Sequence, residues 1–336
     1  GSGDFNIGNG SGDPAVQYWN NATIAQICQD LQVTCTSSCS GFPVTGTGTF
    51  ISGNTGLGGV GDANSLQLWL RANDLNQTDG TSVTSWSDIS GNGLTAIADG
   101  GGGTEPTFNT NTVNGTLPSI SFDNGDYLNL GQPAGLDFIP GTDSWSFFIV
   151  YNVSNATETG TFLSKADGNG GNRTYQYTMD QSGGTYSFTS FIGGDWQTGS
   201  VVSNTGNWFV SSHSNNTTVR NSWTNETTNI VNDAIGTNTT GAVDVLIGAR
   251  RQTAPSTGFG FPLDGEIAEI AMYDGEMTEA QRVIITNYLA AKYNITLNAN
   301  DVYTEDDNGF DFDVIGIGQA SDGTNHRDSK GSNVAR

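Results

Sequence analysis

The chain is poor in basic residues and has no long apolar run. Its 336 residues include 11 lysines and arginines against 34 aspartates and glutamates, which gives a formal net charge of −23 at pH 7. A negative field repels phosphate, so this balance argues against nucleic acid and against anionic membranes. No segment reaches the roughly 18 apolar residues that a membrane-spanning helix needs. We therefore expect no nucleic-acid partner and no membrane insertion.

Histidine and the common catalytic motifs are scarce as well. The two histidines, His213 and His326, have no spacing suited to a metal site or a catalytic triad, and we expect both at the surface. No nucleophile elbow, phosphate-binding loop or dinucleotide fingerprint occurs. These absences disfavour an enzyme.

Cysteine is limited to Cys28, Cys35 and Cys39, which lie within one short segment. Three pairings are possible, each leaving one thiol over, and we expect one local disulfide. A zinc site is the alternative, but the CxxxC spacing without a nearby histidine lacks ligands for tetrahedral coordination. A disulfide would indicate an oxidising compartment.

Glycine and small polar residues are abundant. The chain has 47 glycines and only 13% charged residues, a composition typical of many short strands joined by tight turns. Runs bounded by Gly, Asn or Asp predict strands at residues 66–70, 83–86, 119–130, 144–153, 160–165, 175–179, 185–192, 207–213 and 243–248. Together they predict an all-β, antiparallel sandwich of two sheets.

The best-specified segment joins a strand, a turn and a helix. Gly265–Tyr273 is apolar on both faces, as in a strand inside a sandwich. Thr278 and Gln281 then form a capping box that predicts a helix start. The helix would pack an apolar face onto the sandwich, while Glu279, Arg282, Asn287 and Lys292 stay available to water.

Three segments resemble a known family. The run Leu263–Tyr293 (LDGEIAEIAMYDGEMTEAQRVIITNYLAAKY) is similar to the closing strand and helix of concanavalin A-like, laminin-G-like jelly-roll domains of large bacterial surface proteins. Leu66–Ala96 and Leu117–Gly131 resemble the opening of the same domains, so the resemblance covers about two-thirds of the chain. It implies a jelly-roll sandwich with a C-terminal amphipathic helix, a fold that hosts lectins, glycosidases, adhesion modules and spacers.

The glycosidases of this family carry an ExDxxE strand, with a nucleophile and a general acid in one cleft. In the equivalent run GEIAEIAMY the middle position is Ala268 and the third acid is absent. Glu266 and Glu269 are expected on opposite faces of the strand. The resemblance therefore favours a non-catalytic module.

Three regions are predicted. Residues 1–60 would hold a glycine-rich lead, the small disulfide-pinned element and most of a Gly-rich linker that spans 51–64. Residues 61–297 would form the laminin-G-like jelly roll. Residues 298–336 would begin a further module.

The resemblance also implies a candidate calcium site, because related domains hold calcium with loop carboxylates and carbonyls. The run SKADGNGGNRTYQY offers Asp167, Asn169 and Asn172 as oxygen ligands, and the alternative is a Gly/Asn hairpin turn. Pentraxins place acids before the closing strand, whereas this chain has Arg250 and Arg251 there, so a double-calcium site is disfavoured.

Aromatic side chains offer flat faces for sugar rings. Tyr175 and Tyr177 share a strand face, and Trp196 lies in the Gly-rich run GGDWQTG. Most aromatics on such strands belong to the core, so Trp196 and Arg251 are the candidates expected to be exposed. These four residues form the predicted ligand-binding set.

We therefore expect an extracellular adhesin or a carbohydrate- or protein-binding module of a bacterial surface protein, with a glycan or a surface protein as its partner. The alternative is a structural subunit or spacer of an extracellular filament or surface layer, which would contact copies of itself or other modules of the same large protein. A glycosidase-related enzyme is the third class.

The cysteine prediction can be checked directly. Intact-mass analysis of freshly isolated protein under alkylating conditions should show Cys28 joined to Cys35 or Cys39 and one alkylated thiol, because so small an element needs a covalent constraint. Three alkylated thiols would contradict it.

Overall fold

The computed structural model describes residues 56–61, 64–98, 105–123, 125–153, 159–168, 173–182, 185–203, 206–239, 242–252, 258–303, 318–320 and 322–326. The three cysteines lie outside these residues, so the disulfide stays a prediction. No helix in the described ranges is long and apolar enough to cross a membrane.

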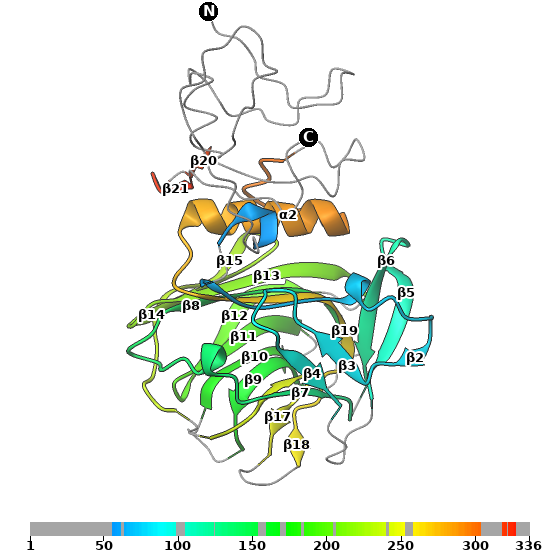
Figure 1. Cartoon of the computed structure of the whole chain (residues 1–336). Coiled ribbons are helices and arrows are strands. Elements are labelled where there is room, and N and C mark those ends of the chain that lie inside the picture. Colours follow the sequence, from blue (N-terminus) through cyan, green and yellow to red (C-terminus); the bar gives the residue numbers. More distant parts are fainter. Residues whose placement is uncertain are drawn as a thin grey trace, which may run out of the picture.

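The described chain is an antiparallel sandwich of two sheets, as predicted, with one α-helix (Figure 1). The first sheet has the order β15 (Thr227–Ala234), β14 (Val219–Thr224), β13 (Trp208–Asn215), β8 (Trp145–Val153), β19 (Gly265–Asp274), β6 (Leu117–Phe122), β5 (Thr107–Val113), β2 (Thr81–Ser82), and β1 (Leu66–Arg71) also pairs with β19. The second has the order β12 (Asp195–Ser203), β11 (Thr185–Ile192), β10 (Arg173–Ser182), β9 (Gly160–Ala166), β16 (Val245–Ile247), β7 (Leu128–Gly131), β4 (Thr95–Ile97), β3 (Ser85–Ser87).

Shorter elements complete the described chain. They are the strand pairs β17 (Arg250–Arg251) with β18 (Phe259–Gly260) and β20 (Gly318–Gln319) with β21 (Asn325–His326), the 3-10 turns η1 (Leu57–Gly59), η2 (Ala72–Asp74) and η3 (Ala134–Leu136), and the helix α2 (Glu279–Tyr293).

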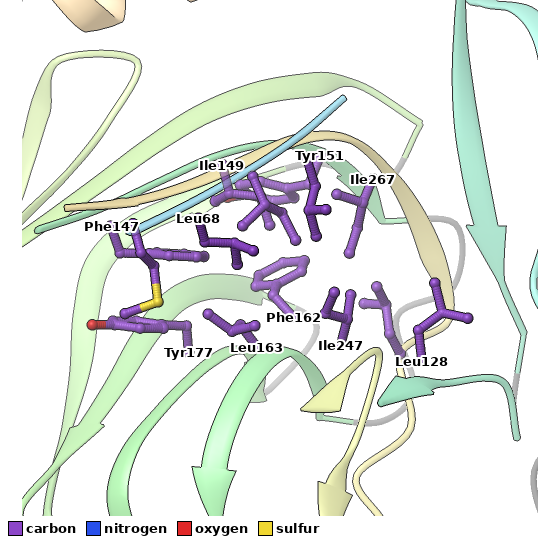
Figure 2. Packing of buried hydrophobic residues seen from close by; sticks show 14 of the residues in the cluster. Leu68, Leu128, Phe147, Ile149, Tyr151, Phe162, Leu163, Tyr177, Ile247 and Ile267 are labelled. Atoms are coloured by element: carbon purple, nitrogen blue, oxygen red, sulfur yellow. The ribbon is translucent and has the colours of Figure 1, made fainter. Parts of the chain in front are cut away.

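The core fills the space between the sheets because alternate residues of each strand point inward. Figure 2 shows Phe147, Ile149 and Tyr151 of β8 facing Phe162 of β9 and Tyr177 of β10. Phe147 and Tyr177 stack with ring centroids 4.1 Å apart. Both sheets therefore present an apolar inner face.

Several strands differ from the sequence prediction. The single strand expected at 119–130 is two strands, β6 and β7, which lie in different sheets. The run around Trp196 is the strand β12 and not a glycine-rich loop. Two polar strands, β14 and β15, had not been predicted because they lack an apolar alternation.

The helix begins where the sequence predicts. The Thr278 side chain accepts a hydrogen bond from the backbone N–H of Gln281, and the Gln281 side chain accepts one from the backbone N–H of Thr278. α2 lies over the outer face of the first sheet, on the side away from β9, β10 and β11 (Figure 1). The predicted packing of the helix onto the sandwich is confirmed.

The prediction that the polar side of α2 faces water is wrong at Arg282, Asn287 and Lys292, which are all buried. Arg282 forms an ion pair with the buried Glu226. The side-chain amide of Asn287 donates to the backbone oxygen of Asn300, 2.8 Å away. The chain after the helix thus returns over it and covers the side that the sequence pattern leaves to water.

A buried carboxylate joins α2 to the sheet. Glu269 of β19 accepts hydrogen bonds from the Trp69 indole at 2.6 Å, from Lys292 Nζ at 2.6 Å and from the Tyr293 hydroxyl at 2.8 Å. Burial lowers the pKa of Lys292, and the charge of Glu269 opposes that effect. β1, β19 and α2 therefore meet at one carboxylate.

A β-bulge between Ile267 and Glu269 sets this geometry. Its register shift against β8 places Ile267 on the core side with Ile270, whereas strict alternation would put Ile267 on the face of Glu269. Glu266 lies elsewhere, where Ser119 donates to it at 3.2 Å, and burial raises its pKa. Because Ile267 and Ile270 both face the core, Glu266 and Glu269 lie on the same face, and the expectation of opposite faces is wrong.

The described part of the glycine-rich run at 51–64 is packed and not a free linker. Leu57 and Val60 are buried in the same cluster as the helix residues Ile284 and Leu289. The backbone N–H of Leu57 donates to the Tyr273 hydroxyl at 2.9 Å. Residues near 56–60 therefore cover the sandwich from the helix side.

Lys292→Met should destabilise the protein by about 3–5 kcal/mol, because it leaves Glu269 buried without its counter-charge. Asp74→Asn, which removes the more exposed Arg71–Asp74 pair, should cost less than about 1 kcal/mol. Urea unfolding of both variants measures the difference. Equal costs would show that the Glu269 pair contributes no more than a surface pair.

His213 is not at the surface as expected but fully buried on β13, with its ring 5.0 Å from that of Tyr177. Burial, reinforced by the charge of Arg220, lowers the pKa of His213 to about 3. The unfolded chain, with an ordinary histidine pKa of about 6.5, then binds more protons between these values. The contribution of neutral His213 to the unfolding free energy is fully present above pH 6.5 and is lost as the pH falls toward 3.

His213→Gln should remove that dependence. Between pH 7 and pH 5 the wild type should lose about 2 kcal/mol more unfolding free energy than the variant, because protonation of the unfolded histidine favours unfolding. Urea unfolding at the two pH values tests this. Parallel pH dependences for the two proteins would contradict it.

Candidate functional site

A hollow lies on the outer face of the second sheet, opposite to the side that α2 covers. Its volume is about 330 Å³, and its lining residues are Thr159, Arg173, Gln176, Asp180, Phe191, Trp196 and Phe261. The lining mixes three aromatic rings with a cation, an anion and two neutral polar groups. Such a composition suits a ligand with both apolar faces and hydroxyl groups.

One row of side chains crosses three strands of the hollow. Gln176 of β10 pairs with Phe191 of β11, which pairs in turn with Trp196 of β12. The inward-facing neighbours Tyr175 and Tyr177 lie in the core, so Gln176 points outward. The rings of Phe191 and Trp196 have centroids 5.6 Å apart. Trp196 is half-exposed, so the row forms an apolar platform beside an amide.

Arg173 joins the hollow through an irregularity of β10. Strict alternation would put Arg173 on the core face with Tyr175, but the register shifts between these two residues. The Arg173 guanidinium lies over the Phe191 ring, 4.1 Å from its centroid. A cation–π contact therefore fixes this arginine beside the aromatic platform.

A second arginine approaches from β17. The Arg250 guanidinium lies over the Phe261 ring, 4.2 Å from its centroid, and donates to the backbone oxygen of Asp167 at 3.3 Å. Burial, together with repulsion from Arg173, lowers the pKa of Arg250 to about 10. Both arginines still carry their charge at neutral pH.

The base of the hollow is polar. Gln176 donates through Nε2 to Thr161 Oγ1 at 3.0 Å, and Thr159 donates to Asp180 at 2.8 Å. Gln176 is buried, yet its side-chain oxygen has no hydrogen-bond partner, and neither has the hydroxyl of the buried Thr178. Buried polar atoms are ordinarily paired, so these two atoms are exceptions among the described residues, and of the two side chains only Gln176 lines the hollow.

Of the residues predicted for ligand binding, Trp196 lines the hollow. Tyr175 and Tyr177 are 0% exposed, and the first donates to the backbone oxygen of Leu136 while the second accepts from the Trp145 indole. They share a face, as expected, but it is the core face. The two tyrosines therefore cannot offer a ring to a ligand.

Arg251 was expected to be exposed, but it is buried, with only 6% of its surface exposed. It forms a 2.7 Å ion pair with Asp244, and its guanidinium lies 5.8 Å from the Tyr127 ring centroid. Its neighbour Arg250 points to Phe261 instead. Arg250, and not Arg251, therefore contacts a residue that lines the hollow.

Asp167, Asn169 and Asn172 were expected as calcium ligands, and the last two lie outside the described residues. Asp167 is buried, and its negative charge acts on both Arg173 and Arg250. Two guanidinium groups nearby disfavour a divalent cation at this carboxylate. The described member of the set fits calcium poorly, and the full set stays a prediction.

The sequence analysis missed the other six lining residues, which are Thr159, Arg173, Gln176, Asp180, Phe191 and Phe261. A signal existed for Gln176 and Asp180, because polar residues alternate with the core residues of β10. No sequence signal marked the bulge that turns Arg173 outward.

No family model matches the chain, and a search of curated proteins finds no significant match. Among solved structures, the chain is similar to the botulinum neurotoxin serotype D binding domain, with 13% identity, a TM-score of 0.44 and coverage of 67% of this chain and 51% of that one. The chain thus spans about half the length of that protein.

Domain 4 of AbnA, an extracellular arabinanase from Geobacillus stearothermophilus solved with arabinotriose, has 15% identity and a TM-score of 0.42 over 65% of this chain and 96% of that one. A pentraxin from Limulus polyphemus has 15% identity and a TM-score of 0.38 over 50% and 82%. At these values the similarities carry no argument about ligand or activity.

Proposed function

We propose that the protein is a non-catalytic carbohydrate-binding module, and that the hollow on the second sheet is its binding site. The observation that carries the proposal is the row Gln176–Phe191–Trp196, which sets an aromatic platform beside a buried amide with an unpartnered oxygen. Sugars have apolar ring faces and hydroxyl edges, so they match both halves of this row.

The residues would divide the work between stacking and orientation. The Trp196 and Phe191 rings would cover the apolar face of a sugar. The Gln176 side-chain oxygen would accept from a sugar hydroxyl and thereby gain the partner it lacks. Asp180, held by Thr159, would accept a second hydroxyl at the other end of the hollow.

The number of carboxylates in the hollow favours binding without hydrolysis. Asp180 is the one carboxylate among the described residues that line the hollow, whereas most glycosidases use two. We extend the proposal to an extracellular setting at a bacterial cell surface, where an adhesin would meet a glycan. This part of the proposal is supported by the acidic, glycine-rich sequence and by its resemblance to surface-protein domains.

Trp196→Ala should weaken glycan binding by about 2 kcal/mol, roughly thirtyfold, because it removes the most accessible ring of the platform. Calorimetric titration with the best ligand from a glycan array measures the change. Trp208→Ala, which removes another half-buried tryptophan from the first sheet, is the matched control and should leave affinity unchanged.

Thermal unfolding of both variants shows whether they fold. Unchanged affinity in a folded Trp196→Ala protein would remove the hollow from the account. Absence of binding to every glycan on the array would overturn the proposed function.

A further inference from the structure

Among the described residues, Arg173 and Arg250 have no carboxylate within ion-pair distance, whereas each of the other lysines and arginines has one. The others are paired: Arg71 with Asp74, Lys165 with Asp137, Arg220 with Asp195 and Asp233, Arg251 with Asp244, Arg282 with Glu226, and Lys292 with Glu269. The chain carries 34 acidic residues against 11 basic ones, so acidic partners are abundant. Two adjacent unpaired arginines are therefore unusual in this protein.

Their hydrogen bonding is also incomplete. The Nε atoms of Arg173 and Arg250 are both buried and have no partner. The contacts with Phe191 and Phe261 use the flat faces of the two guanidinium groups, and one in-plane nitrogen of Arg250 donates to the backbone oxygen of Asp167. The site thus holds unused donors that prefer an anionic acceptor.

The negative charge of Asp167 offsets the positive charge of Arg173 and Arg250 only in part. Asp167 lies close enough to raise the pKa of each arginine, but burial has the larger effect and lowers the pKa of both. Repulsion from Arg173 lowers the pKa of Arg250 further. A second negative charge beside the pair would relieve both the repulsion and the lost hydration.

We infer that the hollow binds an acidic saccharide, whose carboxylate or sulfate group lies against Arg173 and Arg250 while a neighbouring sugar ring stacks on Trp196. This inference rests on the proposed function, since it names the ligand class of the same site. Asp180 lies seven residues from Arg173 along β10, about 23 Å in an extended strand. That carboxylate disfavours a second anionic group at its end, so one end of the hollow takes the acidic sugar and the other a neutral one.

Two matched ligand pairs test the inference. The first pair is tetragalacturonate and its methyl ester, which keeps the ring shape and loses the charge. The second is a sulfated galactan tetrasaccharide and its desulfated form. Calorimetric titration of the full chain should show at least tenfold tighter binding of the charged member in one or both pairs.

The arginine variants then locate the anion. Arg173→Gln and Arg250→Gln should each weaken binding of the charged ligand about ten- to a hundredfold while changing binding of its neutral counterpart less than threefold. Arg71→Gln removes the same charge far from the hollow and should leave the affinity unchanged. Arg173→Lys keeps the charge but loses the planar fork, and should recover only part of the affinity. Thermal unfolding checks that each variant folds.

Each outcome decides between the two claims. Equal affinity for both members of both pairs, or no binding of either pair by a protein that binds a neutral glycan through Trp196, overturns the acidic ligand and leaves the proposed function standing. Equal losses in Arg71→Gln and Arg173→Gln also overturn it. Failure to bind any sugar overturns both.

Discussion

The buried carboxylate of Glu269 links the parts of this fold that lie furthest apart in sequence. Its hydrogen bonds reach Trp69 on β1 and Lys292 and Tyr293 on α2, so the start and the end of the sandwich close on one strand. A charge inside the protein is costly unless it is paired and hydrogen-bonded, and here it is both. Because α2 is held against the first sheet, it covers the outer face of that sheet, whereas the hollow lies on the outer face of the second sheet.

The second sheet shows how small backbone irregularities create a site. A regular β10 would present Gln176, Thr178 and Asp180 outward and keep Arg173 on the core side. The register shift near Arg173 changes that, and the guanidinium reaches the Phe191 ring. A second such shift, in β19, places Ile267 on the core side, while Glu269 stays on the helix side with Ala271 and Tyr273. Both bulges redirect a side chain that alternation alone would send elsewhere.

Much of the fold could be predicted from the sequence, because strand periodicity and helix capping are local. The capping box at Thr278 and Gln281, the strand Gly265–Tyr273 and the two-sheet sandwich follow from patterns of a few residues. The division of residues 119–130 between two sheets could not be predicted, since it depends on which strands are neighbours in space.

Burial of charged side chains was harder to predict than secondary structure. Arg282 and Lys292 fall on the polar side of the helix, yet Glu226 and Glu269 meet them from distant strands. The candidate site divides in the same way. Trp196 was identified because it lies in a glycine-rich run, although that residue belongs to the strand β12, while Arg173 and Arg250 become neighbours only after folding.

The central claim, that a sugar occupies the hollow beside Trp196, is tested most directly by NMR of the tryptophan indole N–H groups during titration with an acidic oligosaccharide. The chain has seven tryptophans, and single substitutions would assign their signals. The account predicts a saturable shift of the Trp196 signal, while the buried Trp86 and Trp145 signals stay in place. Saturable shifts confined to tryptophans of the first sheet, with Trp196 unmoved, would contradict it.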